Sequence, residues 1–361
     1  MKAKNTITQN QFILMTIQSQ IGVGVLSLPY KTFGAAKSDA WISVLLTGVL
    51  VQISILIIWA LCRRFPSYTL FEFLNFLLGK VLGSILTVVY IIYFISVCMI
   101  LLYYYSHVMK TWILPLTPIW FTTLLMVFTS YYLGKESLQI IARFFGVVFI
   151  LLVIVLLLIS YGLKHANIFY ILPIGQSEWG AIFKGSKESL LAFSGFEAFL
   201  IMYPFIEGTG RGKLKSMFIA NLIVTMFYTY IVIVTLLFFS PEEMSRMPEP
   251  LLYLVKIFSS QIITRTDLIF LSIWIISIMT SIVICMYVAS NGLATLLKKK
   301  NHNQVLPIIT VIIYLFALFS TDIEILNILE NYVSNAAIVL TLLIPFCLLC
   351  LTYIKNKCEV R

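Results

Sequence analysis

The stretch Phe-Ser-Gly-Phe-Glu-Ala-Phe, residues 193–199, lies inside an apolar run that extends from Leu190 to Phe205. This run is long enough to cross a bilayer, yet it carries a carboxylate, Glu197, near its centre. A charged side chain at the middle of a membrane helix costs about 2.5–3.5 kcal/mol on insertion scales. Gly195, two residues earlier, weakens the helix at the same place. The stretch therefore predicts a membrane helix that is interrupted at its centre, where the interruption has a function.

The composition of the whole chain indicates a membrane protein. Of its 361 residues, 60% are hydrophobic and 11% are charged, and the mean hydropathy is +1.00. Soluble proteins carry about 25% charged residues. No stretch is polar enough for a separate soluble domain, so residues 1–361 are expected to form a single transmembrane domain in contact with the lipid bilayer. The net charge of +10 is spread over several short loops, which argues against a nucleic-acid partner.

The apolar segments predict an all-α polytopic protein with ten transmembrane helices. They lie near residues 10–33, 40–62, 82–109, 117–133, 143–163, 188–206, 215–239, 267–296, 305–320 and 330–354. With ten spans, sixteen of the 25 Lys and Arg residues fall on the side of the N-terminus and nine on the other side. Because positive charge is enriched in cytoplasmic loops, both termini are expected in the cytoplasm.

A second interrupted helix is expected in the first span. Residues 20–29 read Gln-Ile-Gly-Val-Gly-Val-Leu-Ser-Leu-Pro, and two glycines followed by a proline favour unwinding near mid-membrane. The first and sixth spans are the first members of two sets of five, so the second set crosses the membrane in the opposite sense. This arrangement predicts two inverted five-helix repeats, about 10–163 and about 188–354, in a leucine-transporter-like fold with helices 1 and 6 broken.

Unwound main chain in a membrane offers N–H and carbonyl groups that need partners. The N–H ends of the half-helices suit an anion such as an amino-acid carboxylate, and the carbonyl ends suit a cation or an ammonium group. We therefore expect a binding surface for a small zwitterion, formed by Gly22, Val23, Gly24, Phe193, Ser194, Gly195 and Phe196. Glu197 either acts on the ligand, through its charge or a proton, or accepts hydrogen bonds from amides that the interruption frees. Both alternatives place Glu197 at the site.

Nothing in the sequence indicates an enzyme, a cofactor or a metal centre. Histidine, cysteine and carboxylate residues form no cluster, and the pair Cys347 and Cys350 lies in an apolar helix with no second pair nearby. That spacing is what a helix face produces by chance, so both are expected to be ordinary helix residues.

Four stretches together resemble the B subunits of spore-germination nutrient receptors, the endospore germination permeases of the amino acid–polyamine–organocation superfamily. The most specific is Phe-Ser-Gly-Phe-Glu at 193–197, which looks like the Phe-x-Gly-x-Glu signature of that family. The others are Ile-Gly-Val-Gly-Val-Leu-Ser-Leu-Pro at 21–29, Leu-Phe-Glu-Phe-Leu at 70–74 with Leu-Gly-Lys at 78–80, and Ala-Ser-Asn-Gly-Leu at 289–293.

The resemblance implies a receptor subunit in the inner membrane of a dormant spore, with an A subunit and a C-subunit lipoprotein as partners. Such a subunit binds a small nutrient, often an amino acid, and its bound state triggers germination; a nucleoside ligand is also compatible with the scaffold. The resemblance also implies that spans three and eight line the pocket. The candidates there are Tyr93 and Val97, then Thr280 and Ser281. Packing alone is the alternative for the first two. The two hydroxyls either complete a sodium-like site with carbonyls of the first interruption or bond back to their own helix.

Two other functions are weighed against the receptor. An amino-acid permease would transport its ligand with ion or proton coupling. The resemblance to the superfamily, in some of whose proton-coupled members a lysine of the fifth span looks as if it replaces the ion, implies looking for a charge there. Residues 144–161 carry no charged residue, so coupling by that route is unsupported. A purely structural membrane partner is the third alternative, and the two interrupted helices argue against it.

Overall fold

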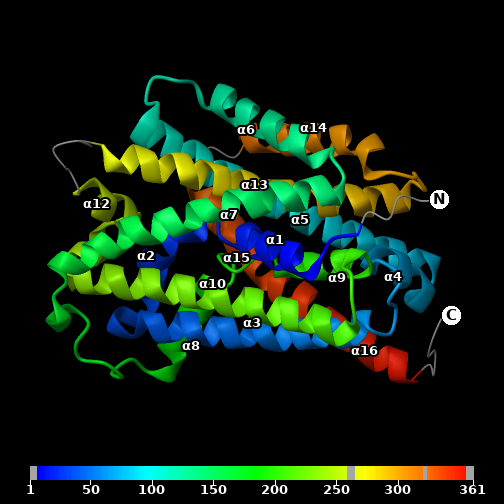
Figure 1. Cartoon of the computed structure of the whole chain (residues 1–361), viewed down its shortest axis with the longest axis horizontal. Helices are drawn as coiled ribbons and strands as arrows, with labels where there is room; N and C mark the ends of the chain where they lie inside the picture. The colour runs from blue at the N-terminus through cyan, green and yellow to red at the C-terminus, as the bar shows by residue number, and fades with distance from the viewer. Residues whose placement is uncertain (1–5, 258–264, 320–322, 355–361) are drawn as a thin grey trace.

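The computed structural model describes residues 6–257, 265–319 and 323–354. Their regular structure is helical, apart from an isolated bridge between Ile7 and Ile206. The α-helices are α1 (Gln9–Gln20), α2 (Gly24–Ala36), α3 (Ala40–Cys62), α4 (Leu70–Leu78), α5 (Lys80–Val108), α6 (Ile119–Gly134), α7 (Leu138–Ser160), α8 (Trp179–Ser189), α9 (Phe199–Met202), α10 (Gly210–Phe238), α11 (Pro241–Arg246), α12 (Pro250–Lys256), α13 (Thr266–Leu296), α14 (Leu306–Phe319), α15 (Ile323–Ile338) and α16 (Ile344–Ile354). Figure 1 shows the long helices packed side by side, with α12 and α4 at opposite ends of the molecule.

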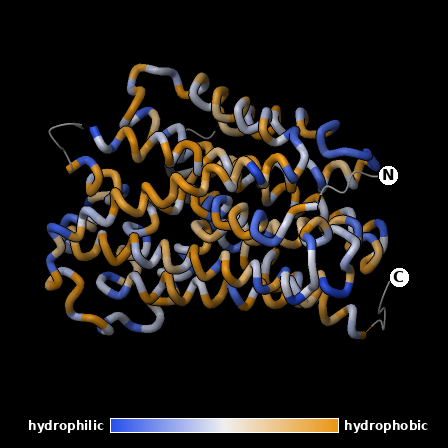
Figure 2. Tube along the Cα trace, in the orientation of Figure 1, coloured by the Kyte–Doolittle hydropathy of each residue, from blue (hydrophilic) through white to orange (hydrophobic). Residues whose placement is uncertain are grey.

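Within the described residues, six helical segments are long and apolar enough to cross a membrane. They are Gly24–Cys62, Lys80–Ile113, Leu138–His165, Gly210–Phe238, Thr266–Leu296 and Ile328–Ile354, and shorter apolar helical segments cover Ile119–Gly134, Phe196–Phe205 and Leu306–Leu318. Hydrophobic residues dominate these helices, while hydrophilic residues gather at their ends and in the loops (Figure 2). Large apolar side chains also face outward; Val81 and Val147, for example, are each 73% exposed. The chain is therefore a multi-pass membrane protein, as its composition predicted.

The segment from Gly24 to Cys62 is two helices joined by a tight turn. Lys37 adopts φ 48°, and Lys37–Asp39 form a 3-10 turn between α2 and α3. The Asp39 carboxylate accepts hydrogen bonds from the main-chain N–H groups of Gly175 at 2.7 Å and Ser177 at 2.9 Å. This side chain thereby attaches the loop before α8 to the turn between α2 and α3.

Helix α8 begins earlier than the sequence predicted. The sixth span was expected to start at residue 188 after a loop over 164–187, but α8 already covers Trp179–Ser189. The lysines and serines of α8 lower its mean hydropathy, so it does not stand out in the sequence as an apolar run. Gly185 allows α8 to approach α3 closely, because a Cβ atom there would lie 2.5 Å from Ser43 Oγ. Glu188 lies in the last turn of α8, whereas a span starting at residue 188 would place it in the first turn.

The segment before α1 is joined to the segment that follows α9. The Ile7 N–H donates to the Phe205 carbonyl oxygen, and the Glu207 N–H donates to the Ile7 carbonyl oxygen, both at 2.9 Å. The buried Lys213 ammonium donates to the Tyr203 carbonyl oxygen at 2.8 Å, at the carboxyl end of the same short segment. These contacts fix the start of α1 against the end of the α9 segment.

Candidate functional site

The chain leaves helical geometry between α1 and α2. Helix α1 ends at Gln20 and α2 begins at Gly24, while Ile21 adopts φ −84° and ψ 88°. Neither glycine of this stretch has room for a side chain. A Cβ atom on Gly24 would lie 2.3 Å from Ala192 Cβ, and one on Gly22 would lie 2.7 Å from Ser281 Oγ. The two glycines therefore let the chain between α1 and α2 contact its neighbours through main-chain atoms.

A second non-helical stretch follows α8. Residues 190–195 form a series of turns, Phe196–Ala198 form a 3-10 turn, and α9 begins at Phe199. Gly195 adopts φ 120°, a conformation that side-chain-bearing residues rarely take. A Cβ atom there would also lie 3.1 Å from the Ser19 carbonyl oxygen. Glycine at 195 thus permits both the turn and its close approach to α1.

Hydrogen bonds join the two non-helical stretches to each other. The Gln20 amide nitrogen donates to the Phe193 carbonyl oxygen at 2.8 Å. The Tyr228 hydroxyl on α10 lies 2.7 Å from the Gln20 carbonyl oxygen and 3.1 Å from the Ala192 carbonyl oxygen, and donates to them. The side chains of Gln20 and Tyr228 therefore provide hydrogen-bond partners for main-chain carbonyl groups that a continuous helix would otherwise have paired.

Glu197 directs its carboxylate onto the second stretch. Its Oε2 accepts from the Gly195 N–H at 2.8 Å, and its Oε1 accepts from the hydroxyls of Ser194 at 2.7 Å and Tyr93 at 3.0 Å. The residue is 1% exposed. These contacts are those of the second alternative for Glu197, in which it accepts a hydrogen bond from an amide at the interruption. Tyr93 is thereby a hydrogen-bond partner of Glu197.

The predicted hydroxyl pair of α13 contacts the carboxyl end of α1. Thr280 Oγ1 donates to the carbonyl oxygens of Gln18 at 3.2 Å and Ser277 at 2.6 Å. Ser281 Oγ lies 2.8 Å from the Ser19 carbonyl oxygen and 3.3 Å from that of Ser277. Each hydroxyl thus bonds both to the carboxyl end of α1 and back to its own helix. A sodium-like site at Thr280 and Ser281 stays a prediction.

A small cavity lies between the two non-helical stretches, and we call it the central cavity. Its volume is about 30 Å³, whereas a single water needs about 10–15 Å³ measured with the same probe. It therefore has room for at most a few waters. Of the predicted site residues, the structure brings seven to its wall: Gly22, Val23, Gly24, Val97, Ser194, Gly195 and Ser281. Five others are not part of the wall: Tyr93, Phe193, Phe196, Glu197 and Thr280.

Several residues of the wall were not expected from the sequence. The polar or ionisable ones are Ser19, Gln20, Ser27, Lys31, Glu188 and Cys285. Gln20 stands out because its Oε1 atom is buried and has no hydrogen-bond partner among the described residues. An unpaired buried acceptor costs free energy unless a ligand or water supplies a donor. The signal for Gln20 was present in the sequence, since it is a polar residue directly before the glycine pair in an apolar span.

The sequence is similar to that of known proteins over most of its length. The family model described as "Spore germination protein" matches residues 6–325. Spore germination protein GerQB of Bacillus cereus is 29% identical over 330 residues, covering 91% of this chain and 90% of that protein. Spore germination protein YndE of Bacillus subtilis (strain 168) is 28% identical over 359 residues, covering 98% of both.

Among solved structures, MhsT in complex with L-phenylalanine superposes with a TM-score of 0.68 at 16% identity, covering 95% of this chain and 88% of that one. At this identity the likeness shows a shared fold. Since the family model spans most of the sequence, the chain belongs to the spore germination permease family.

Proposed function

We propose that this chain is the B subunit of a spore nutrient-germinant receptor, which binds a small nutrient in the central cavity and thereby triggers germination. The observation that carries the proposal is the meeting of two non-helical stretches around a small cavity walled by Gly22, Gly24, Ser194 and Gly195. The unpaired Gln20 oxygen supplies an acceptor for a ligand ammonium or N–H group. An amino acid is the ligand class we favour, and its entry requires the cavity to expand.

The proposal includes a ten-span topology. The spans are α1 with α2, α3, α5, α6, α7, α8 with α9, α10, α13, α14, and α15 with α16, which divide into two inverted sets of five. An even number of spans places both termini on one side, and the distribution of Lys and Arg favours the cytoplasm. We further propose the inner spore membrane as the location, and an A subunit and a C-subunit lipoprotein as partners.

An amino-acid permease is the second candidate, and the fold shared with MhsT favours it. The two functions differ in whether the ligand crosses the membrane. We expect thermal stabilisation of the purified protein by one or a few members of a panel of L-amino acids and nucleosides, because a ligand that binds the folded state raises its stability. Concentrative uptake of the same labelled compound into proteoliposomes by this chain alone would favour the permease and count against a pure sensor.

The Gln20 side chain provides a direct test of the binding site. Gln20→Leu is expected to weaken the binding of the stabilising compound about 10–100-fold, because it removes a hydrogen bond to a charged or N–H donor worth about 1.5–3 kcal/mol. Affinity is measured by titration calorimetry on the purified protein.

Gln18→Leu is the matched control for this change. Gln18 is also buried, and its amide nitrogen makes one hydrogen bond, to Ser277 Oγ at 3.4 Å. Its Oε1 likewise has no partner in the described part of the chain, but Gln18 is not part of the cavity wall. We expect it to lower thermal stability to a similar extent and to change affinity less than about threefold. Equal losses of affinity in both variants would show that Gln20 acts only through packing.

A further inference from the structure

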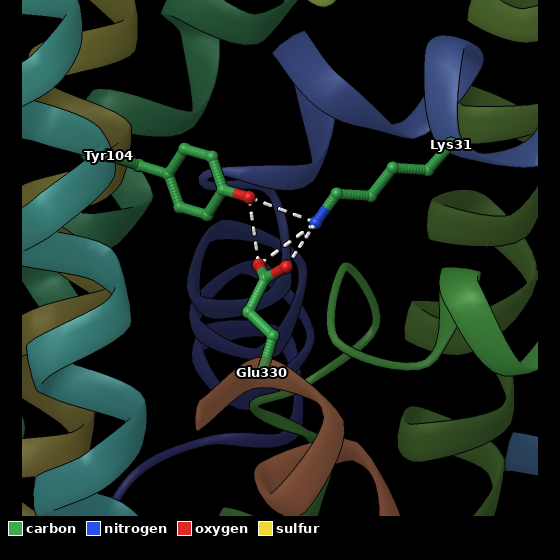
Figure 3. Close-up of polar contacts among 3 residues, drawn as sticks. All are labelled: Lys31, Tyr104 and Glu330. Atoms are coloured by element: carbon green, nitrogen blue, oxygen red, sulfur yellow. Dashed lines mark hydrogen bonds and ion pairs between the residues drawn. The ribbon is translucent and has the colours of Figure 1, made fainter. Parts of the chain in front are cut away.

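Helix α5 is attached to its neighbours on either side of Cys98. After Cys98, Tyr104 accepts from Lys31 of α2 at 2.9 Å and donates to Glu330 of α15 at 2.8 Å (Figure 3). The two charged side chains also pair with each other at 2.7 Å. Before Cys98, Tyr93 donates to the carboxylate of the second non-helical stretch at 3.0 Å. Cys98 therefore lies in a part of α5 that is held in place from both sides.

Two thiols meet between α5 and α13. Cys98 on α5 is fully buried, and Cys285 on α13 is 3% exposed. The Cys98 thiol donates to the Ile282 carbonyl oxygen, with 3.8 Å between sulfur and oxygen, and the Cys285 side chain is a further hydrogen-bond partner of Cys98. Since the one proton of Cys98 is directed at Ile282, the Cys285 thiol is the donor of the second bond. The two sulfur atoms are therefore direct neighbours.

This thiol pair borders the central cavity. Cys285 is part of the cavity wall, and so is Val97, which precedes Cys98 on α5. An atom bonded to both sulfurs would join α5 to α13 at the wall. Because the cavity has a volume of about 30 Å³, such an atom would also take up part of the space that a ligand needs.

The number of ligands and the local charge limit what this pair can bind. Among the described residues, no group of three or more His, Cys, Asp and Glu side chains could hold a metal ion. The pair therefore offers two sulfurs, whereas a structural Zn²⁺ site takes four ligands. Two thiolates around a soft monovalent ion such as Cu⁺ would form an anion. The Glu197 carboxylate already acts electrostatically on Cys285, and a second buried negative charge beside it is costly. The pair thus favours a centre that bonds both sulfurs and leaves them uncharged.

We propose that Cys98 and Cys285 form a two-sulfur binding site for small, neutral compounds of trivalent arsenic, and that an occupant of this site prevents nutrient binding in the central cavity. Arsenous acid reacts with the two thiols by exchange. Two As–S bonds form, two As–O bonds break, and each thiol proton leaves with a hydroxyl group as water. Arsenic stays trivalent, so no oxidant or reductant is needed, and the product keeps one hydroxyl group and no charge. The block of nutrient binding rests on the proposed function, whereas the two-sulfur site does not.

The arsenic content of the purified full chain tests the two-sulfur site without any nutrient. Cys347, Cys350 and Cys358 are first replaced by alanine, because the first two are exposed and lie one turn apart on α16, where they form another thiol pair. The protein is incubated with arsenous acid and freed of excess by gel filtration, and its arsenic is measured by inductively coupled plasma mass spectrometry. We expect about one arsenic atom per chain, because once one sulfur is bonded the second reacts within the same molecule.

Single replacements of the thiols show whether both sulfurs are needed. Cys98→Ser and Cys285→Ser each leave one thiol of the pair, and each is expected to lower the arsenic content at least about tenfold. Cys62→Ser is the matched control, because Cys62 is also a buried free thiol but is not part of the cavity wall. This control should keep the arsenic content of the parent. Should the serine variants fail to fold, Cys98→Ala and Cys285→Ala decide the matter by the same measurement.

The affinity for the stabilising compound, measured by titration calorimetry, tests the block of nutrient binding. Arsenic is expected to weaken this affinity at least about tenfold in the parent, to leave it unchanged in Cys98→Ser, and to lose its effect when dithiothreitol removes it.

A parent that holds no arsenic would overturn the two-sulfur site, and so would equal arsenic contents in the parent and the serine variants. Full occupancy with unchanged affinity would overturn the block of nutrient binding. A parent that binds arsenic but none of the amino acids and nucleosides would instead count against the proposed function, while its arsenic content would still support the two-sulfur site.

Discussion

Gly24→Ala is expected to weaken the nutrient response of spores severely, whereas Gly34→Ala, ten residues further along the same helix, should leave it unchanged. The added methyl at position 24 would lie 2.3 Å from Ala192 Cβ and 2.9 Å from both Ala192 Cα and the Tyr228 hydroxyl oxygen. These atoms belong to the main chain, a short side chain and a buried ring, so moving them aside costs free energy. The two non-helical stretches must separate, which disturbs the hydrogen bonds of Tyr228 to Gln20 and Ala192.

Gly34 is a close control because a Cβ atom there would meet no atom of the described residues within 4 Å. Alanine is favoured over glycine in a helix by about 1 kcal/mol, so helix propensity raises stability in both variants and cannot explain a loss. Overpacking of a well-packed site costs about 1–3 kcal/mol or more, which the Gly24 variant alone incurs.

The response is measured as germination of spores over a range of germinant concentrations, with the amount of protein in the membrane determined by immunoblot. We expect a shift in the effective concentration of at least about 100-fold for Gly24→Ala at normal protein levels. A dose–response curve that matches the parent would show that the close approach of the two stretches is not needed for the response.

The sequence drew attention to residues 20–24 and 193–197 because glycines are conspicuous inside apolar runs. Gly22, Gly24 and Gly195 each occupy a position where the main chain approaches a neighbour, and a glycine there signals that approach without any knowledge of the neighbour. The family resemblance pointed to α5 and α13 as further contributors, and Val97 and Ser281 do border the central cavity.

The ion pair of Lys31 and Glu330 was beyond such reasoning. Lys31 was counted only as a marker of topology, and its partner lies 299 positions away on another helix. No local pattern links two residues at that separation, since their contact depends on how α2 and α15 pack. The start of α8 was missed for a different reason, because its buried face consists mostly of small and polar residues such as Gly185, Ser186 and Ser189.

Glu197 offers the second large effect, and two substitutions are expected to behave differently. Glu197→Ala removes the acceptor for the Gly195 N–H and for the hydroxyls of Ser194 and Tyr93. A buried donor left without a partner costs about 1–3 kcal/mol, so this variant should lose about 2–5 kcal/mol of stability and all ligand binding. Glu197→Gln can keep its oxygen on the Gly195 N–H, while its amide nitrogen donates to the two hydroxyls, which rotate to accept.

We therefore expect Glu197→Gln to bind its ligand within about fivefold of the parent and to unfold at a temperature within a few degrees of it, because its hydrogen bonds can all be made again. Both properties are measured on the purified protein, by titration calorimetry and by thermal unfolding in detergent. Loss of binding in the glutamine variant at unchanged stability would instead assign Glu197 a role for its charge, as a partner of the ligand or as a proton carrier. The stability of Glu197→Ala gives an independent check, because removal of a charge that acts only on the ligand leaves the stability of the empty protein unaffected, whereas removal of the acceptor for the Gly195 N–H lowers it.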